Sequence, residues 1–329
     1  MTEQKQGMSK GRIVLAWIFF ICLGAVLVGS LALRILNTPL APKLKVTESP
    51  IQSAPTEITP VVEAASEAQP TQTSGACGAE GSLTLLVLGE SDPNNNYMRG
   101  ADAIRLVNVN FDTNEIKVTA FPPVLWANTS QIPLLKSDGS TLTAAYYIAK
   151  QSLNGDERNK MAYASNVVAQ TLANNFRISA DNYITMKEST FTDIVNTLGG
   201  VTMNLPAGEL TLNGQQALDY SRLLGSNPAL ISEWNRFDRQ NQLLVGISHE
   251  ISSFESVSSY PGLVNDYYKD VVTDLSIKQL ADLTCVFQKS EGKFEYVEFK
   301  RTLLSGEQND VLLPNTSEIT QYYQTNFTP

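Results

Sequence analysis

Apolar runs and alternating stretches along the chain predict the start of a β-sheet. Residues 83–89 (LTLLVLG) form a short, fully apolar run that ends at glycine, which is typical of a strand buried on both faces. The alternating stretch DAIRLVNVNF, the turn DTNE and the stretch IKVTAFP follow over residues 102–122. This order predicts a hairpin whose two strands pair with each other.

Later segments show helical spacing of their apolar residues, interrupted by further short strands. The pattern predicts helices over 142–149, 158–174, 189–200, 213–223, 236–253 and 275–287, and strands over 182–189, 201–206 and 293–300. The pair Gly199-Gly200 is expected to end one of these helices. Because strands and helices alternate, we expect one layered α/β domain over residues 82–325, with 123–140 as a long loop.

One apolar run is much longer than a strand or a core helix requires. Residues 13–33 contain no charged side chain, and 21 residues at about 1.5 Å each cross a hydrocarbon core of about 30 Å. We therefore predict a single membrane-spanning helix over 13–33, with residues 1–12 as a cytoplasmic tail and the larger part of the chain outside the membrane. A cleaved signal peptide is the alternative, although its apolar region usually has only about 7–15 residues.

The segment after this run has a different composition. Residues 34–81 are rich in Pro, Thr, Ser, Glu, Ala and Gln and contain few large apolar side chains. Such a composition cannot build a core and predicts a disordered extracytoplasmic stalk.

Cysteine, histidine and charge narrow the classes of function. Of three cysteines, Cys22 lies in the predicted span, so Cys77 and Cys285 are expected to form a disulfide outside the membrane, with two unrelated thiols as the alternative. The chain has one histidine, which argues against the usual zinc sites. The net charge of −9 argues against nucleic acid as a partner.

Several cationic and amide side chains nevertheless gather between residues 218 and 247, namely Arg222, Arg236, Arg239 and Gln240. Arg236 and Gln240 are four residues apart, so we expect them on one helix face near its N-terminus, where free N–H groups favour anions. Arginine binds phosphate through two parallel hydrogen bonds. The alternative is a solvated face on which these arginines pair with nearby carboxylates.

Six segments together resemble the LytR-CpsA-Psr family of wall-polymer ligases over essentially the whole domain. They are LLVLG, RGADAIRLVNVNFDTNEIKVTAFP, TAAYYIAKQ, NYITMKESTFTDIVNTLGGVTMNLP, LNGQQALDYSR and NRFDRQNQLL. The resemblance implies a membrane-anchored extracytoplasmic phosphotransferase, which moves a glycopolymer from a polyprenyl-pyrophosphate carrier to peptidoglycan with Mg²⁺ or Mn²⁺. It also implies a central mixed β-sheet flanked by helices, and an apolar tunnel for the polyprenyl tail.

The resemblance assigns roles to individual residues of this chain. Asp102, Arg222 and Arg236 are the expected catalytic residues, and Arg99, Arg222, Arg236, Arg239 and Gln240 are the expected pyrophosphate ligands. Asp102 and Asp92 are the expected metal ligands. Glu90 also follows Gly89 closely, so Glu90 and Asp92 both remain candidates for the first acid.

The chain departs from the family pattern at three places. Pro123 and Val124 stand where Arg and Asp are expected, Leu224 replaces a second Arg, and Thr141 replaces a Lys. Lys136, Arg105 or Lys187 would have to make up the charge, although Arg105 is expected to point outward from its strand and Lys187 to lie on the surface.

These departures leave three hypotheses for the function. The first is an active ligase. The second is a catalytically degenerate relative that binds a polyprenyl-linked or other amphiphilic ligand, or the wall, without transfer. The third is a purely structural anchor. Another cation in the site would favour the ligase, and an apolar lining made by Pro123, Leu224 and Trp126 would favour the binder.

Overall fold

The computed structural model describes residues 36–45, 77–92, 100–205, 208–222, 229–253, 270–291 and 293–327. The predicted tail and span (1–33), most of the predicted stalk, Arg99 and Leu224 lie outside these ranges. Among the helices of the described ranges, none has the length and apolar character needed to cross a membrane.

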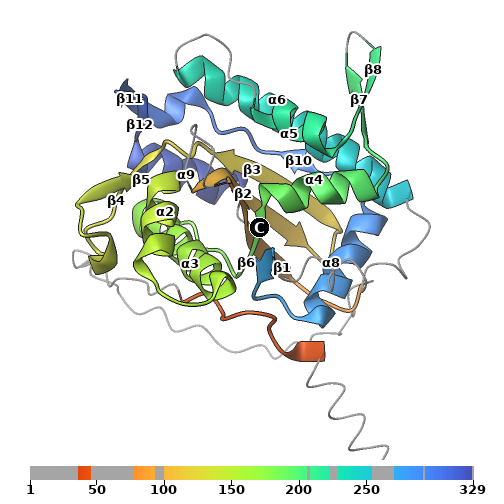
Figure 1. Cartoon of the computed structure of the whole chain (residues 1–329), viewed down its shortest axis with the longest axis horizontal. Helices are drawn as coiled ribbons and strands as arrows, with labels where there is room; N and C mark the ends of the chain where they lie inside the picture. Colours follow the sequence, from red (N-terminus) through yellow and green to blue (C-terminus); the bar gives the residue numbers. More distant parts are fainter. Residues whose placement is uncertain are drawn as a thin grey trace, which may run out of the picture.

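A six-stranded mixed sheet forms the centre of the domain (Figure 1). Its strands are β1 (Ser82–Glu90), β2 (Ala101–Asn110), β3 (Glu115–Phe121), β6 (Asn182–Lys187), β9 (Val271–Thr273) and β10 (Glu295–Tyr296), in the spatial order β10-β3-β2-β1-β6-β9. The β1–β6 and β10–β3 pairs are parallel, and the other pairs are antiparallel. The prediction of an α/β domain around a mixed sheet is confirmed.

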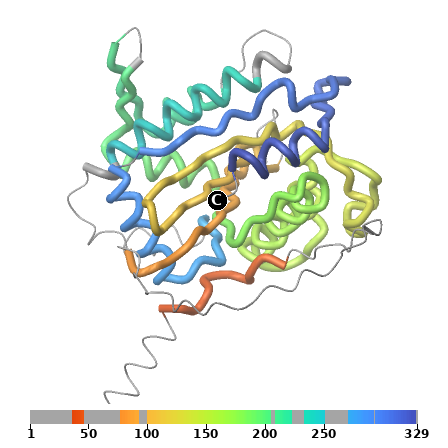
Figure 2. Tube along the Cα trace, turned by 180° about the vertical axis from the view of Figure 1, so that it is seen from behind, coloured from red at the N-terminus to blue at the C-terminus, as the bar shows by residue number. Residues whose placement is uncertain are grey.

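Helices cover both faces of this sheet (Figures 1 and 2). One face packs against α2 (Leu142–Ser152), α3 (Glu157–Phe176) and α9 (Thr316–Asn326), and the other packs against α4 (Glu188–Thr197), α5 (Gly214–Arg222), α6 (Ala229–Ser253) and α8 (Ile277–Lys289). Leu86, Leu88, Ile104 and Leu106 point to the α2–α3 face, where all four are almost fully buried. The intervening strand residues therefore point toward α4–α6.

Three short hairpins lie outside the central sheet. They are β4 (Trp126–Asn128) with β5 (Gly139–Thr141), β7 (Val201–Leu205) with β8 (Gly208–Leu212), and β11 (Leu304–Gln308) with β12 (Val311–Pro314). The 3₁₀ turns η1 (Pro133–Leu135) and η3 (Arg301–Leu303) complete the described elements. The loop predicted over 123–140 thus contains β4, η1 and the first two residues of β5. The predicted strand over 201–206 pairs with β8, not with the sheet.

Helix α6 begins earlier than its sequence pattern predicts. It starts at Ala229, seven residues before Arg236. The indole Nε1 of Trp234 donates to the Phe299 carbonyl at 3.0 Å, and this side chain is buried. Because a partner distant in sequence fixes this turn of the helix, the local pattern did not reveal it.

Residues 36–45 and 77–81 of the predicted stalk lie against the domain, in contrast to the prediction of disorder for 34–81. The Leu40 N–H donates to Leu275 O at 3.1 Å, and the Leu44 N–H donates to Asp274 Oδ2 at 3.1 Å. The hydroxyl of Tyr183 donates to Pro42 O at 3.2 Å. Figure 2 shows this segment, residues 36–45, along the lower edge of the domain. Hydrogen bonds to the domain hold these residues in place, which composition does not reveal.

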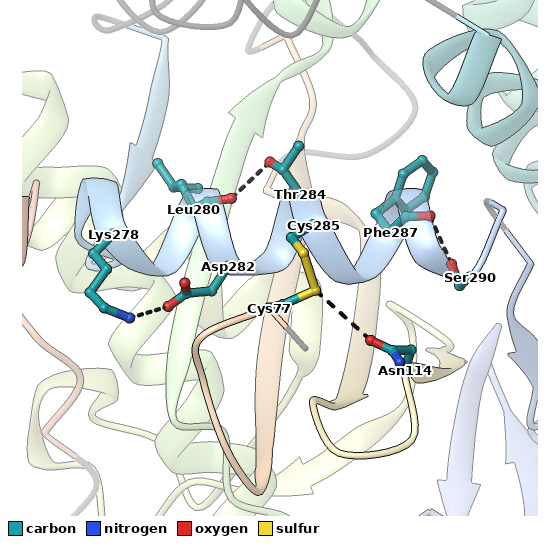
Figure 3. The surroundings of a disulfide bond; sticks show 9 residues. All are labelled: Cys77, Asn114, Lys278, Leu280, Asp282, Thr284, Cys285, Phe287 and Ser290. Carbon is teal, nitrogen blue, oxygen red and sulfur yellow. Dashed lines mark hydrogen bonds and ion pairs between the residues drawn. A yellow bond between two sulfur atoms is a disulfide. The ribbon is translucent and has the colours of Figure 1, made fainter. Parts of the chain in front are cut away.

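A disulfide joins Cys77 to Cys285, across 208 positions of sequence. Figure 3 shows the bond between the segment that precedes β1 and the middle of α8, with Asn114 beside it. Cys77 belongs to a buried apolar cluster that includes Val109, Val118 and Val286. The bond therefore ties the start of the domain to the helix that covers β2 and β3.

Removing this disulfide is expected to lower the free energy of unfolding by about 2–4 kcal/mol, because the bond restricts the unfolded chain. The measurement compares urea unfolding of the chain from residue 36 onward with that of its Cys77→Ala/Cys285→Ala variant. Dithiothreitol should destabilise the parent chain and leave the variant unchanged. Equal unfolding midpoints for the oxidised parent and the variant would contradict the expectation.

Candidate active site

A cavity of about 330 Å³ lies between the central sheet and helices α4, α5 and α6. Strands β1, β2 and β6 form its floor. Its apolar lining consists of Val87, Leu88, Gly89, Ala103, Met186, Phe191, Ile194, Leu218, Leu243, Leu244 and Ile247. Such a lining suits the hydrocarbon part of a ligand.

Each of the three helices presents one or more charged residues and, further along its axis, apolar residues to the cavity. Helix α4 contributes Glu188 and then, three and six residues along the helix, Phe191 and Ile194. Helix α5 contributes Arg222 and, four residues away, Leu218. Helix α6 contributes Arg236 and, further along, apolar side chains from Leu243 onward. The charged side chains therefore gather at one end of the cavity, which we call the polar end.

Two arginines at the polar end are held by carboxylates. Arg222 forms an ion pair with Glu188. Arg236 Nη2 lies 2.6 Å from Glu233 Oε2, and the two side chains are only 2% and 4% exposed. Burial raises the pKa of Glu233, although the adjacent Arg236 opposes this shift. The polar end thus contains two arginines held by carboxylates, of which Arg236 is almost fully buried and Arg222 is partly exposed.

Asp102 lies at the same end of the cavity, at the start of β2. Burial raises the pKa of Asp102, while the charges of Arg236 and Arg222 act in the opposite direction. The structure therefore brings Asp102 together with Arg222 and Arg236, which come more than a hundred residues later in the sequence.

The structure separates Glu90 from Asp92. Glu90 is buried and accepts a hydrogen bond from the Tyr146 hydroxyl at 3.0 Å, and it forms an ion pair with Lys150. Both partners belong to α2, on the opposite face of the sheet. The Asp92 N–H instead donates to Glu188 Oε1 at 2.8 Å. Burial lowers the pKa of Arg222, while the negative charges of Asp102 and Asp92 act in the opposite direction. Of these two acids, Asp92 is therefore the one whose charge acts on Arg222.

The side chains of Gln240 and Arg239 point in different directions from α6. Gln240 lines the cavity, and its Nε2 donates to Ser221 O at 3.4 Å. Arg239 turns toward α5, where its Nε donates to Tyr220 O at 2.9 Å. The prediction that Arg236 lies near a helix N-terminus is wrong. Because α6 begins at Ala229, Arg236 lies about two turns inside the helix, beyond the free N–H groups.

Arg105 is a functional candidate whose position the sequence pattern did not predict correctly. We expected it to point outward, but it lines the cavity and the residue is 6% exposed. Its Nη1 donates to Asn241 Oδ1 at 2.9 Å and its Nη2 to Gln240 Oε1 at 3.1 Å. Burial lowers the pKa of Arg105 to about 10. The apolar run of β1 is the sequence feature from which this position could have been predicted. It indicates a sheet covered on both faces, so β2 has no outward face.

Lys187 also lines the cavity, where its Nζ lies 2.8 Å from Asp270 Oδ1. Its side chain is about one third exposed, so the expected surface position is only partly correct. The cavity wall thus includes two cations, Arg105 and Lys187, besides Arg222 and Arg236.

Comparison with known proteins gives the family of the chain. Residues 51–327 match the model of the LytR_cpsA_psr family. The chain belongs to the LytR-CpsA-Psr family.

Relatives within this family include transferases of teichoic acid. The polyisoprenyl-teichoic acid–peptidoglycan teichoic acid transferase TagU of Bacillus subtilis is 26% identical over 147 residues, which cover 41% of this chain and 47% of TagU. TagU of Bacillus anthracis is 23% identical over 212 residues, covering 61% of this chain and 63% of the relative. The chain spans about half the length of the first of these curated relatives.

Solved structures of the LytR-CpsA-Psr family share the fold. The crystal structure of B. subtilis TagV superposes with a TM-score of 0.58 at 19% identity, covering 76% of this chain and all of TagV. The structure of TagT bound to LIIa-WTA has a TM-score of 0.54 at 19% identity, covering 74% of this chain and 89% of TagT.

The places where this chain departs from the LytR-CpsA-Psr pattern have structural roles of their own. Pro123 O accepts from the Thr143 N–H at 2.9 Å, and Val124 O accepts from the Leu312 N–H at 3.1 Å. Thr141 is the N-cap of α2 and accepts from the Ala144 N–H at 3.3 Å. Trp126 is 40% exposed. Among the described residues, the cavity lining includes neither Pro123 nor Trp126.

The acidic residues at the polar end suit a magnesium ion that the protein binds only in part, with substrate phosphates and water as the other ligands. Within the described ranges, no three His, Cys, Asp or Glu side chains form a metal-binding cluster. Mg²⁺, however, usually binds one or two carboxylates together with substrate phosphates and water, not a complete protein cage. Asp102 and Asp92, which both act on Arg222, provide that number of carboxylates.

Proposed function

We propose that this protein is a membrane-anchored extracytoplasmic phosphotransferase that moves a glycopolymer from a polyprenyl-pyrophosphate carrier to peptidoglycan. The observation that carries the proposal is the cavity, apolar along most of its wall, with Asp102, Arg222 and Arg236 at its polar end. The names of TagU and of the TagT complex with LIIa-WTA support the same class of reaction. The predicted span over residues 13–33 would provide the anchor.

The two parts of the cavity match the two parts of such a carrier. The apolar walls suit a polyprenyl tail, and the arginines suit a pyrophosphate, since guanidinium groups bind phosphate bidentately and stay charged. A guanidinium has five N–H donors, so Arg236 can keep its bond to Glu233 and still donate to a phosphate. Phosphoryl transfer depends mostly on positioning and charge neutralisation, which these side chains supply.

Asp102 and Asp92 would hold the divalent cation, Mg²⁺ or Mn²⁺, at this end of the cavity. When bound, the cation would neutralise phosphate oxygens as charge develops on them. Arg239 would support the site indirectly, because its guanidinium binds the Tyr220 carbonyl of α5, two residues before Arg222.

Cations in the cavity wall favour a transferase over a protein that only binds the carrier. The missing arginines at Pro123 and Leu224 were the main argument for the binder. Arg105 and Lys187 line the cavity and restore positive charge there.

Transfer by the purified full-length chain in detergent tests the proposal. The substrates are a polyprenyl-pyrophosphate oligosaccharide with a label in its sugar part and peptidoglycan fragments. The product is separated by size, and the reaction is run with Mg²⁺ and with excess EDTA. We expect the label to reach peptidoglycan only with the metal. Arg177→Gln, which changes an exposed arginine at the end of α3, serves as the control and should transfer normally. Binding of the carrier without any transfer would contradict the proposal.

A further inference from the structure

The charged groups of the cavity leave one cation without a carboxylate partner. Arg222 pairs with Glu188, Arg236 with Glu233 and Lys187 with Asp270. Within the described part of the chain, no carboxylate forms an ion pair with Arg105. Its hydrogen-bond acceptors are the neutral amide oxygens of Asn241 and Gln240, and the Tyr296 hydroxyl, also neutral at pH 7, lies beside it.

A buried charge that has only neutral partners is costly, because its desolvation is not repaid by an opposite charge. The lowered pKa of Arg105, about 10, reflects this burial. A guanidinium nevertheless stays protonated at neutral pH, so it remains a positive charge beside an apolar cavity. An anionic ligand would compensate it.

The position of Arg105 along the cavity indicates which part of the carrier it meets. On α6, Gln240 lies four residues beyond Arg236, which is about one helical turn, or about 6 Å. The apolar side chains of Leu243, Leu244 and Ile247 follow further along. Arg105, held by Gln240 and Asn241, therefore lies between the polar end and the apolar part of the cavity.

We propose that Arg105 binds the phosphate that carries the polyprenyl chain, while Arg222 and Arg236 bind the phosphate that carries the glycopolymer. This assignment rests on the proposed function. It makes the cavity a site with two successive phosphate contacts, followed by the hydrocarbon part.

The assignment gives Arg105 a role in the transfer step. An acceptor hydroxyl oxygen forms a bond to the phosphorus that carries the glycopolymer, and the bond from that phosphorus to the bridging oxygen breaks. The electron pair of the broken bond stays on the polyprenyl monophosphate, which gains one negative charge, and the hydroxyl proton passes to solvent. Arg105 lies where that charge develops and stabilises the leaving group.

The most specific test keeps Arg105 and neutralises its positive charge with a carboxylate on a neighbouring residue. Asn241→Asp keeps the acceptor atom that lies 2.9 Å from Arg105 Nη1 and adds a carboxylate charge beside the guanidinium. The matched control is Gln242→Glu, which adds the same charge at the next position of α6 on an exposed side chain. Isothermal titration of the full-length chain uses geranyl monophosphate, geranyl diphosphate and geraniol as probes.

We expect Asn241→Asp to weaken binding of both geranyl phosphates about 10- to 100-fold, which is the loss of one charge-assisted hydrogen bond. Geraniol should bind equally to all variants, and Gln242→Glu should resemble the parent chain. Arg105→Gln should lose the same affinity and Arg105→Lys should restore part of it, with the thermal midpoint of each variant measured alongside.

Two outcomes would overturn the assignment: geranyl monophosphate binding to the parent chain no more tightly than geraniol, or unchanged phosphate binding in Asn241→Asp. The transfer assay separates this from the proposed function. If no transfer occurs but Asn241→Asp still weakens phosphate binding, the transferase proposal fails and the Arg105 phosphate site stands. If transfer occurs and Asn241→Asp binds like the parent, only the role of Arg105 is wrong.

Discussion

Arg222→Ala is expected to reduce the rate of glycopolymer transfer by about a thousandfold or more. Removing an arginine that stabilises a phosphoryl-transfer transition state typically costs about 10³–10⁵ in rate. Arg222 lines the cavity, lies within the electrostatic reach of Asp102 and Asp92, and its Nε has no hydrogen-bond partner among the described residues. Single-turnover rates with saturating carrier measure the effect on the chemical step.

Two other variants make this prediction specific. Arg222→Lys keeps the positive charge but loses bidentate hydrogen bonding to phosphate, so its transfer rate should lie between those of the parent and Arg222→Ala. Arg239→Gln removes a neighbouring arginine of α6 that faces the Tyr220 carbonyl, and it should change the rate by less than about tenfold. Equal losses in Arg222→Ala and Arg239→Gln would show that the effect comes from packing between α5 and α6, not from phosphate binding.

Arg236→Ala is expected to lower the free energy of unfolding by about 3–5 kcal/mol, as well as to abolish transfer. Breaking a buried ion pair by removing one partner leaves the other charge uncompensated. Glu233, 4% exposed, would remain in the apolar interior without Arg236. Denaturant unfolding of the chain from residue 36 onward, monitored by tryptophan fluorescence, measures the loss.

The pH dependence of this loss identifies its cause. Burial already raises the pKa of Glu233 above its usual value of 4.5, and removing Arg236 takes away the main opposing charge. The folded state then binds a proton more tightly than the unfolded state, so stability falls as pH rises through the folded-state pKa. The deficit of Arg236→Ala should therefore shrink as the pH is lowered toward the unfolded value of Glu.

A double variant tests the same cause without a change of pH. Glu233→Gln/Arg236→Met removes both charges and should recover most of the stability lost in Arg236→Ala, because paired removal of a buried ion pair is often nearly neutral. If the double variant were as unstable as Arg236→Ala, lost packing around Arg236 would explain the effect, and the uncompensated charge would not.

The local sequence pattern was sufficient to predict most helices and strands and the candidate residues of the site. The apolar run of β1, the alternation of β2 and β3, and the helical spacing of α3 and α5 predicted those elements, because each signal lies within one segment. The sequence also predicted the residues Asp102, Arg222 and Arg236, which the fold brings to one end of a cavity. The pairing of Cys77 with Cys285 followed from their being the two cysteines outside the predicted span.

Features that depend on partners distant in sequence were not predictable in the same way. Arg105 points inward because α6, over 130 residues later, covers its face of β2 and provides Gln240 and Asn241. Glu90 lies outside the cavity because Lys150 and Tyr146 of α2 bind it on the opposite face of the sheet. Residues 36–45 lie on the domain because Asp274 and Leu275 bind their backbone.

The physical reason is the same in each case. Alternation and helical spacing specify which side of an element a residue occupies, but not what covers that side. Whether a charged side chain is solvated or buried in a cavity depends on the element packed against it. Sequence therefore predicted the family, most of the elements and the candidate residues of the site, while packing between elements determined which of those residues face the cavity and with which partners.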